Sequence, residues 1–180
     1  MEWFTADTHF QHANILSFGA ATRGHFTNIR EHDDGLIRNW NERVSPNDTV
    51  YHLGDFGYGS AARSIEILSS LNGHKILVPG NHDKKLLNNG AFVRLFDQVA
   101  PYSYLEISIK GQSIVLSHFP IWEWWAIHYG AIHLHGHVHG TPTGIPGKIM
   151  DVGVDAQGLA PVSFDEVMAI MDTKPLRRHK

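Results

Sequence analysis

Residues 76–83 read Ile76-Leu77-Val78-Pro79-Gly80-Asn81-His82-Asp83, a short apolar run that ends in a glycine and three polar side chains. Such a segment is typical of a strand that leaves a sheet and turns toward a helix. Three adjacent polar side chains directly after a buried strand are costly to bury unless they are paired or bind a metal. Asn81 offers an amide oxygen, His82 a proton near neutral pH, and Asp83 a carboxylate that can orient the imidazole. The stretch therefore predicts a metal ligand beside a general acid, although a simple polar turn would have the same composition.

The chain before this stretch alternates between β-forming runs and helical patterns. Residues 2–5, 49–53 and 75–78 are expected to form short strands, because they are rich in apolar and β-forming side chains. Residues 29–44 carry apolar side chains at helical spacing, and Ser60 can cap a second helix of the same kind. The order strand, helix, strand, helix, strand favours a parallel sheet covered by helices.

The chain after residue 100 has a different pattern. Residues 102–117 are expected to form a hairpin, and short strands are expected at 132–134 and 149–154. The segment Ser163-Phe164-Asp165-Glu166 matches a capping box, which predicts that a last helix begins there. A second, partly antiparallel sheet follows from this half of the chain.

The composition is that of one globular domain. The chain has 180 residues, of which 42% are hydrophobic, so residues 1–180 are expected to form a single α/β domain around one sizeable core. No apolar segment approaches the roughly 20 residues that cross a bilayer, and the N-terminus lacks a signal-peptide pattern, so a cytoplasmic protein is expected. The net charge of -3 disfavours an extended nucleic-acid surface and leaves small phosphorylated substrates open.

The chain has no cysteine and 14 histidines, so a metal ion would be held by imidazole, carboxylate, amide or water. Besides residues 80–83, several segments place Asp or His where an apolar run ends. Because ligands of open α/β sheets collect outside the carboxyl ends of the strands, these side chains are expected to meet at one edge. Glycine directly precedes Asp55, Asn81 and His137, which suits a backbone that turns sharply and approaches an ion closely. The segments are Asp7-Thr8-His9, Gly54-Asp55, His118 and Gly136-His137-Val138-His139.

Together these segments supply more ligands than one ion needs, which suggests two ions that share a carboxylate. Two ions about 3.5 to 4 Å apart can activate water near neutral pH and stabilise both the entering and leaving oxygens of a phosphoryl displacement. Nitrogen and oxygen ligands without sulfur suit Mn, Fe, Zn, Co or Ni, and Mn is expected to support activity. The candidate ligands are Asp7, His9, Asp55, Asn81, His118, His137 and His139.

The ordered set Asp7-x-His9, Gly54-Asp55, Gly80-Asn81-His82-Asp83, His118 and Gly136-His137-x-His139 resembles the calcineurin-like metallophosphoesterases. Residues 3–14 and 51–56 are similar to a small bacterial or phage-type branch of that family. The resemblance implies a four-layer α/β/β/α sandwich of two mixed β-sheets flanked by helices, with a dinuclear site at the strand-end edge. It implies that His82 protonates the leaving oxygen while Asp83 steadies His82. It further implies that one metal is held by Asp7, His9, Asp55 and His139, and the other by Asp55, Asn81, His118 and His137, with Asp55 bridging.

One departure from the family bears on the substrate. Members that act on phosphoserine or phosphothreonine proteins carry a Gly-Asp-x-x-Asp-Arg-Gly block, whereas residues 54–59 read Gly-Asp-Phe-Gly-Tyr-Gly. Because the phosphate-gripping arginine is missing, we expect the substrates to be phosphodiesters, small or nucleotide-like. A hydroxide shared between the two metals is expected to carry out the hydrolysis. The alternatives are a nuclease on single strands or ends, a phosphomonoesterase, and a non-catalytic scaffold that kept the fold.

Three side chains outside the ligand set are candidate substrate contacts. Arg23 could meet a phosphate, because arginine favours bidentate bonds to phosphate oxygens. His12 could contact the substrate or stabilise its own turn. Trp122, with Trp124 and Trp125, could form a stacking wall for a nucleobase, although packing is the commoner role of an aromatic cluster.

The remaining histidines are expected to be structural or exposed. Burial with a backbone hydrogen bond is expected for His52, His133 and His135. A surface position is expected for His25, His32, His74 and His179.

Overall fold

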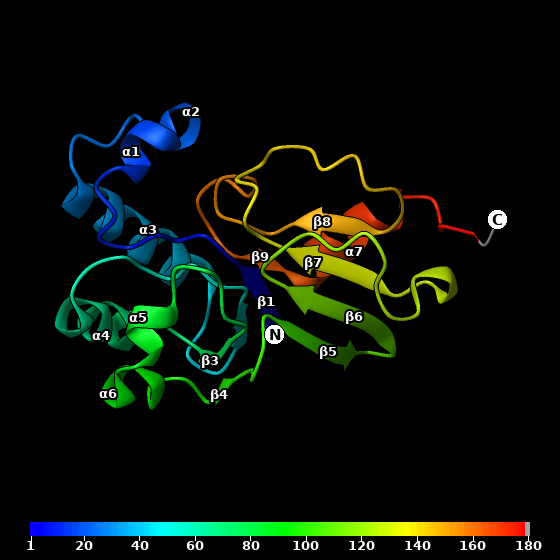
Figure 1. Cartoon of the computed structure of the whole chain (residues 1–180), viewed down its shortest axis with the longest axis horizontal. Coiled ribbons are helices and arrows are strands. Elements are labelled where there is room, and N and C mark those ends of the chain that lie inside the picture. Colours follow the sequence, from blue (N-terminus) through cyan, green and yellow to red (C-terminus); the bar gives the residue numbers. More distant parts are fainter. Residues whose placement is uncertain (179–180) are drawn as a thin grey trace.

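The computed structural model describes residues 1–178, which form two mixed β-sheets packed together and flanked by helices (Figure 1). In the first sheet, of order β4-β3-β2-β1-β9, four neighbouring strands run parallel and β9 is antiparallel to β1. In the second, of order β5-β6-β7-β8, β5 is antiparallel to β6 and the other three are parallel. The strands are β1 (Glu2–Thr5), β2 (Thr49–His52), β3 (His74–Leu77), β4 (Gln98–Val99), β5 (Tyr104–Ile109), β6 (Gln112–Ser117), β7 (Ile132–His135), β8 (Ile149–Asp151) and β9 (Val162–Ser163).

Several helices begin at side-chain caps, and those at Ser60 and Ser163 are the caps that the sequence predicts. The side chains of Asn28, Ser60 and Ser163 each accept a hydrogen bond from the first turn of the helix that follows, and Ser163 forms the full capping box with Glu166. Within residues 1–178, no helix has both the length and the hydropathy that a membrane span requires. The helices are α1 (Ile15–Phe18), α2 (Ala20–Arg23), α3 (Ile29–Arg43), α4 (Ala61–Ser70), α5 (Lys84–Leu87), α6 (Gly90–Val93) and α7 (Phe164–Met171), with a 3₁₀ helix η1 at Ile127–Tyr129.

Strands β1 and β7 lack an exposed polar face because both of their faces are covered, whereas the edge strand β5 leaves alternate side chains exposed. The outer face of the first sheet packs on α3 and α4 through a core that includes Trp40 and Leu68. Phe4 of β1 and Leu134 of β7 belong to the core between the sheets, to which α7 also contributes. The outer face of the second sheet is covered by Trp124 and the segment around η1. The α/β fold of two mixed sheets flanked by helices is therefore confirmed.

The strand register aligns the ends that carry the candidate ligands. Thr5, His52 and Leu77 are neighbours across the parallel strands β1, β2 and β3, so the three strands end together. A bridge between Ala6 and Gly153 then joins the end of β1 to the chain that leaves β8. The carboxyl ends from both sheets thereby meet at one edge of the sandwich.

Candidate metal centre

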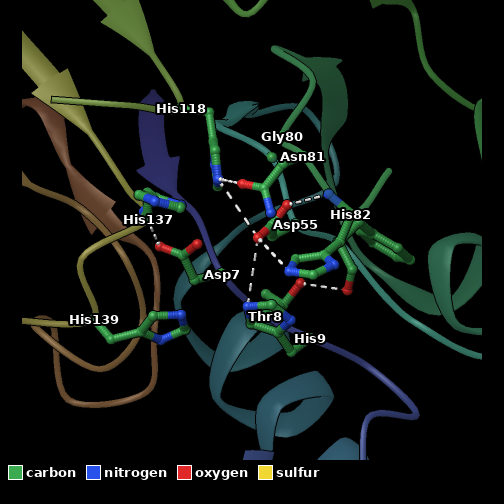
Figure 2. A network of polar contacts seen from close by, with 12 residues as sticks. Asp7, Thr8, His9, Asp55, Gly80, Asn81, His82, His118, His137 and His139 are labelled. Atoms are coloured by element: carbon green, nitrogen blue, oxygen red, sulfur yellow. Dashed lines mark hydrogen bonds and ion pairs between the residues drawn. The ribbon is translucent and has the colours of Figure 1, made fainter. Parts of the chain in front are cut away.

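Six of the seven candidate ligands fall into two groups of three, and within each group the ligand atoms lie within 4.8 Å of one another. Asn81 joins the second group, because its Oδ1 lies 2.9 Å from His118 Nε2. Figure 2 shows the labelled aspartate and histidine side chains gathered around one space from loops of both sheets. We name the groups the first half-site, which is Asp7, His9 and His139, and the second half-site, which is Asp55, Asn81, His118 and His137.

The carboxylate of Asp55 lies between the two half-sites. Its Oδ2 is 3.7 Å from His9 Nε2 and 3.5 Å from His118 Nε2. Its Oδ1 accepts a hydrogen bond of 2.9 Å from the main-chain N–H of His82, which fixes the orientation of the carboxylate. One carboxylate oxygen therefore faces ligands of both half-sites, as a bridging ligand would.

Three buried polar atoms of the first half-site have no hydrogen-bond partner among residues 1–178, although Asp7 Oδ2 accepts from the main-chain N–H of His137 at 2.8 Å. Asp7 Oδ1 and both ring nitrogens of His9 are buried without a hydrogen bond. Burial raises the pKa of Asp7 to about 8 and lowers the pKa of His9 to about 2, so each group is destabilised in its charged form. Unpartnered buried polar atoms are costly, and a carboxylate beside neutral imidazoles is a donor set that a divalent cation binds. The residues present therefore fit a metal.

Hydrogen bonds on the far side of two imidazole rings turn their Nε2 atoms toward the centre. His118 Nδ1 donates to the main-chain oxygen of Leu53 at 2.8 Å. His139 Nδ1 donates to Asp155 at 2.7 Å, a contact that raises the pKa of His139. Because carbonyl and carboxylate oxygens accept, the Nδ1 atoms hold the protons and the Nε2 lone pairs are left for a metal.

The backbone at the candidate ligands is unusual. Five of the seven have positive φ, a region that residues other than glycine seldom adopt. Such conformations persist only where the surrounding structure imposes them, and they gather at functional sites. The values are 57° at Asp7, 48° at His9, 55° at Asp55, 72° at His137 and 49° at His139.

Glycines beside the ligands allow close approach of the loops, as the sequence predicts. A Cβ at Gly54, where φ is 91°, would lie 2.3 Å from the main-chain nitrogen of Gly80. A Cβ at Gly80 would lie 2.3 Å from Asp55 Oδ1, and one at Gly136 would lie 2.6 Å from Asp7 Oδ2. Any larger residue would displace a carboxylate or a neighbouring loop.

In the structure, the Asp83 carboxylate is hydrogen-bonded to main-chain groups and does not make the predicted contact with His82. The Asp83 carboxylate is fully buried and accepts three main-chain N–H groups, from Asp55 at 2.9 Å, Phe56 at 2.9 Å and Gly80 at 2.8 Å. Asp83 thus joins the loop that carries Asp55 to the loop that carries Asn81. The side chain of His82 points elsewhere, with its Nε2 3.9 Å from Asp55 Oδ2.

The predicted phosphate contact of Arg23 is also contradicted. Arg23 is fully buried, and its guanidinium pairs with Asp155 at 2.5 Å while donating to the main-chain oxygens of Asp7 at 2.7 Å and Thr8 at 3.1 Å. Asp155 also accepts from His139. The ion pair therefore supports Asp7 and His139, and it leaves no free guanidinium face for a substrate.

Sequence reasoning missed Asp155, although one signal was present. The segment Gly153-Val154-Asp155 follows the end of β8 at Asp151, so an aspartate again follows a strand and a glycine. The predicted strand at 149–154 obscured this position. A Cβ at Gly153 would lie 2.6 Å from Asp7 Oδ2, so this glycine also borders the first half-site.

A cavity of about 600 Å³ opens beside the first half-site. His12 and His82 line it, whereas Trp122 does not. Trp122 is exposed and stacks on the guanidinium of Arg177, and Trp124 is buried in the core. The tryptophans therefore form no wall of this cavity. Its lining residues are His9, His12, Asn14, Ile15, Phe18, Gly19, Tyr58, His82, Val138, His139 and Thr141.

The other histidines mostly lie where they were expected. His52, His133 and His135 are buried and hydrogen-bonded to main-chain atoms. His25 and His74 are exposed, and His179 lies outside the described residues. The surface prediction for His32 is wrong, because its ring is buried between Arg23 and Asp33, 3.1 Å and 3.0 Å away.

Comparisons with known proteins place the sequence and the fold among related proteins. The Gene 66 protein of Mycobacterium phage L5 is 29% identical over 94% of this chain and 93% of its own length. A crystal structure of a protein of unknown function from Aquifex aeolicus is 30% identical with a TM-score of 0.75, over 94% of this chain and 98% of that one. An archaeal phosphodiesterase shares the fold at a TM-score of 0.50 and 20% identity, over 84% of this chain and 81% of that one.

The two half-sites and the glycines that precede their ligands lie within the region that a known family matches. The family model for calcineurin-like phosphoesterases matches residues 3–150, which is more than half of the sequence. The chain therefore belongs to the calcineurin-like phosphoesterase family.

Proposed function

We propose that this protein hydrolyses phosphodiesters with the help of two metal ions and with His82 as the general acid. The observation that carries the proposal is the Asp55 carboxylate, whose Oδ2 lies 3.7 Å and 3.5 Å from imidazole nitrogens of the two half-sites. Family membership supplies the hydrolase class, and this carboxylate supports a centre for two ions over a centre for one.

The ligand assignment follows the two half-sites. Asp7, His9 and His139 would hold one ion, and Asn81, His118 and His137 the other, with Asp55 shared. Two divalent ions bound there would activate a water molecule and neutralise charge on the phosphoryl oxygens. The mixed nitrogen and oxygen ligands suit Mn, which we expect to support activity.

His82 occupies a position suited to a proton donor. Its side chain is 40% exposed and lines the cavity, so it can exchange protons with solvent and reach a leaving oxygen. Its ring lies 5.6 Å from the ring of His9, at the edge of the first half-site. A general acid must be within hydrogen-bond reach of the leaving oxygen, and His82 belongs to neither group of candidate ligands.

The charge of the cavity favours diesters over monoesters. Among residues 1–178, no Arg, Lys, Asp or Glu side chain lines it, and the nearby Arg23 is engaged with Asp155. Proteins usually hold a terminal phosphate dianion with Arg or Lys. A diester carries one negative charge and a second substituent, so it suits a cavity of this kind better.

The test uses bis(4-nitrophenyl) phosphate as the diester and 4-nitrophenyl phosphate as the monoester. The Mn-loaded protein should cleave the diester with the higher kcat/KM, exhaustive chelation should abolish turnover, and added Mn should restore it. Elemental analysis of the loaded protein should find two ions per chain. Turnover that survives chelation would disprove the mechanism, and a preference for the monoester would reverse the assigned substrate class.

A further inference from the structure

Two exposed aromatic side chains stand at the cavity beside the first half-site. Phe18, the last residue of α1, is 76% exposed, and Tyr58, in the loop after β2, is 57% exposed. Both line the cavity although their segments are 40 positions apart in sequence. Large aromatic surfaces left in water beside a functional site are typical of ligand-binding surfaces.

A third ring connects the two. The imidazole of His12 lies 4.8 Å from the ring of Tyr58 and 6.2 Å from that of Phe18, measured between centroids. The ring of Tyr58 is also 5.5 Å from that of His82. The aromatic wall, which we define as Phe18, His12 and Tyr58, therefore leads directly to the proposed proton donor.

The chemistry of the wall indicates what it binds. In the described part of the chain, the cavity is lined by aromatic and aliphatic groups, imidazoles, hydroxyls and an amide, and by no side chain with a permanent charge. Its volume of about 600 Å³ exceeds what a phosphate alone would fill and falls in the range of small-molecule sites. A flat, uncharged group with polar edges fits such a lining, because every aromatic ring face can stack on another.

We propose that the aromatic wall binds a planar aromatic substituent of the phosphodiester, such as the base of a nucleoside. This inference rests on the proposed function, because it assumes that the phosphoryl group lies at the metal centre. It assigns to Phe18 and Tyr58 the stacking role that the sequence suggested for Trp122.

The experiment compares two diesters that share one leaving group, thymidine 5′-(4-nitrophenyl) phosphate and methyl 4-nitrophenyl phosphate. The protein should bind the thymidine ester with a KM about tenfold lower than that of the methyl ester, given the usual strength of base stacking on aromatic side chains. Phe18→Ala and Tyr58→Ala should each raise the KM of the thymidine ester about fivefold and leave the methyl ester within about twofold. Tyr102→Ala removes an aromatic ring that is 77% exposed outside the cavity, and it should change neither value.

The outcomes separate the two proposals. Equal KM values for the two esters, unaffected by either variant, would overturn the aromatic wall and leave phosphodiester hydrolysis standing. Failure to cleave both esters would overturn the proposed function instead. In that case, binding of thymidine to the metal-free protein, followed by NMR, decides the inference: shifts that Phe18→Ala and Tyr58→Ala abolish support it, and an absence of shifts rejects it.

Discussion

The two half-sites share one carboxylate but differ in how the protein holds them. In the first half-site, Asp7 and His9 are buried with unpartnered polar atoms, and a buried ion pair lies behind them. In the second, Asn81 and His137 are exposed, so solvent can reach their polar atoms. From this difference we predict that the first half-site binds its cation more tightly than the second. We therefore expect titration of the metal-free protein with Mn to resolve a tight and a weaker ion.

Loss of the shared carboxylate should have the largest effect and should abolish the difference in Mn affinity between the two half-sites. Asp55→Asn keeps the size of the side chain but removes the charge that faces both half-sites, so we expect diesterase activity to fall about 10³-fold. Elemental analysis should show that bound Mn falls below two ions per chain. Asp165→Asn, at an exposed carboxylate paired with Lys110, is the matched control and should leave both values unchanged. Full activity of Asp55→Asn would refute a shared role.

Removal of His82 should separate chemistry from metal holding. Because His82 is outside both half-sites, His82→Ala should retain both ions and lose activity according to the leaving group. The loss should be about 10²-fold for an alkyl alcohol and only a few-fold for nitrophenol, which needs little protonation. The measurement is kcat for a pair of diesters that differ in leaving group. Equal losses would show that His82 does not act as the acid.

Disruption of the buried ion pair should weaken the first half-site alone. Arg23→Met leaves the buried Asp155 carboxylate without its guanidinium partner, which should lower the free energy of unfolding by about 3 to 5 kcal/mol. The tight Mn affinity should fall about 10- to 100-fold, because Asp155 orients His139. Calorimetric Mn titration and thermal unfolding measure both effects.

Two further variants keep this prediction testable. Arg23→Lys retains the charge and should fold even where Arg23→Met does not, with a smaller loss of the same affinity. Arg43→Met breaks an exposed ion pair with Glu166 and should cost under about 1 kcal/mol without changing Mn binding. If Arg23→Lys lowers only the affinity for the weaker Mn ion, Arg23 does not support the first half-site.

The smallest effect is expected at Asp83, behind the second half-site. Asp83→Asn places an amide among three main-chain N–H groups, so at least one bond is lost and stability should fall by about 1 to 3 kcal/mol. The weaker Mn affinity should fall with it, and the tight affinity should fall less although Asp55 is shared, while the dependence on the leaving group stays unchanged. A changed dependence on the leaving group would support the role that the sequence suggested for Asp83, which is to steady His82.

The candidate ligands could be predicted from the sequence because the rule that locates them is local. Parallel strands end at one edge, so an Asp or His directly after an apolar run is carried there by the fold. Asp7, Asp55 and His118 all follow such runs. The long helices were equally accessible, since caps such as Asn28 and Ser60 mark their first turns.

The supporting contacts could not be predicted because they join distant segments. Arg23 and Asp155 are 132 positions apart, and no local pattern links them. Asp83 follows His82 directly, yet its carboxylate accepts two N–H groups from the loop of Asp55 and the N–H of Gly80, which are better partners than an exposed ring. The strands β4 and β9 have two residues each, too few to show a period.

The left-handed backbone at five candidate ligands has a consequence for how an ion is acquired. Hydrogen bonds from within the protein hold these loops, among them those of Arg23 to the main-chain oxygen of Asp7 and of the Asp55 N–H to Asp83, so we expect the ligands to keep their positions when a cation binds. Capture would then require mainly dehydration of the ion. The metal-free chain should accordingly take up cations rapidly, and the element that it carries in a cell should reflect supply as much as preference.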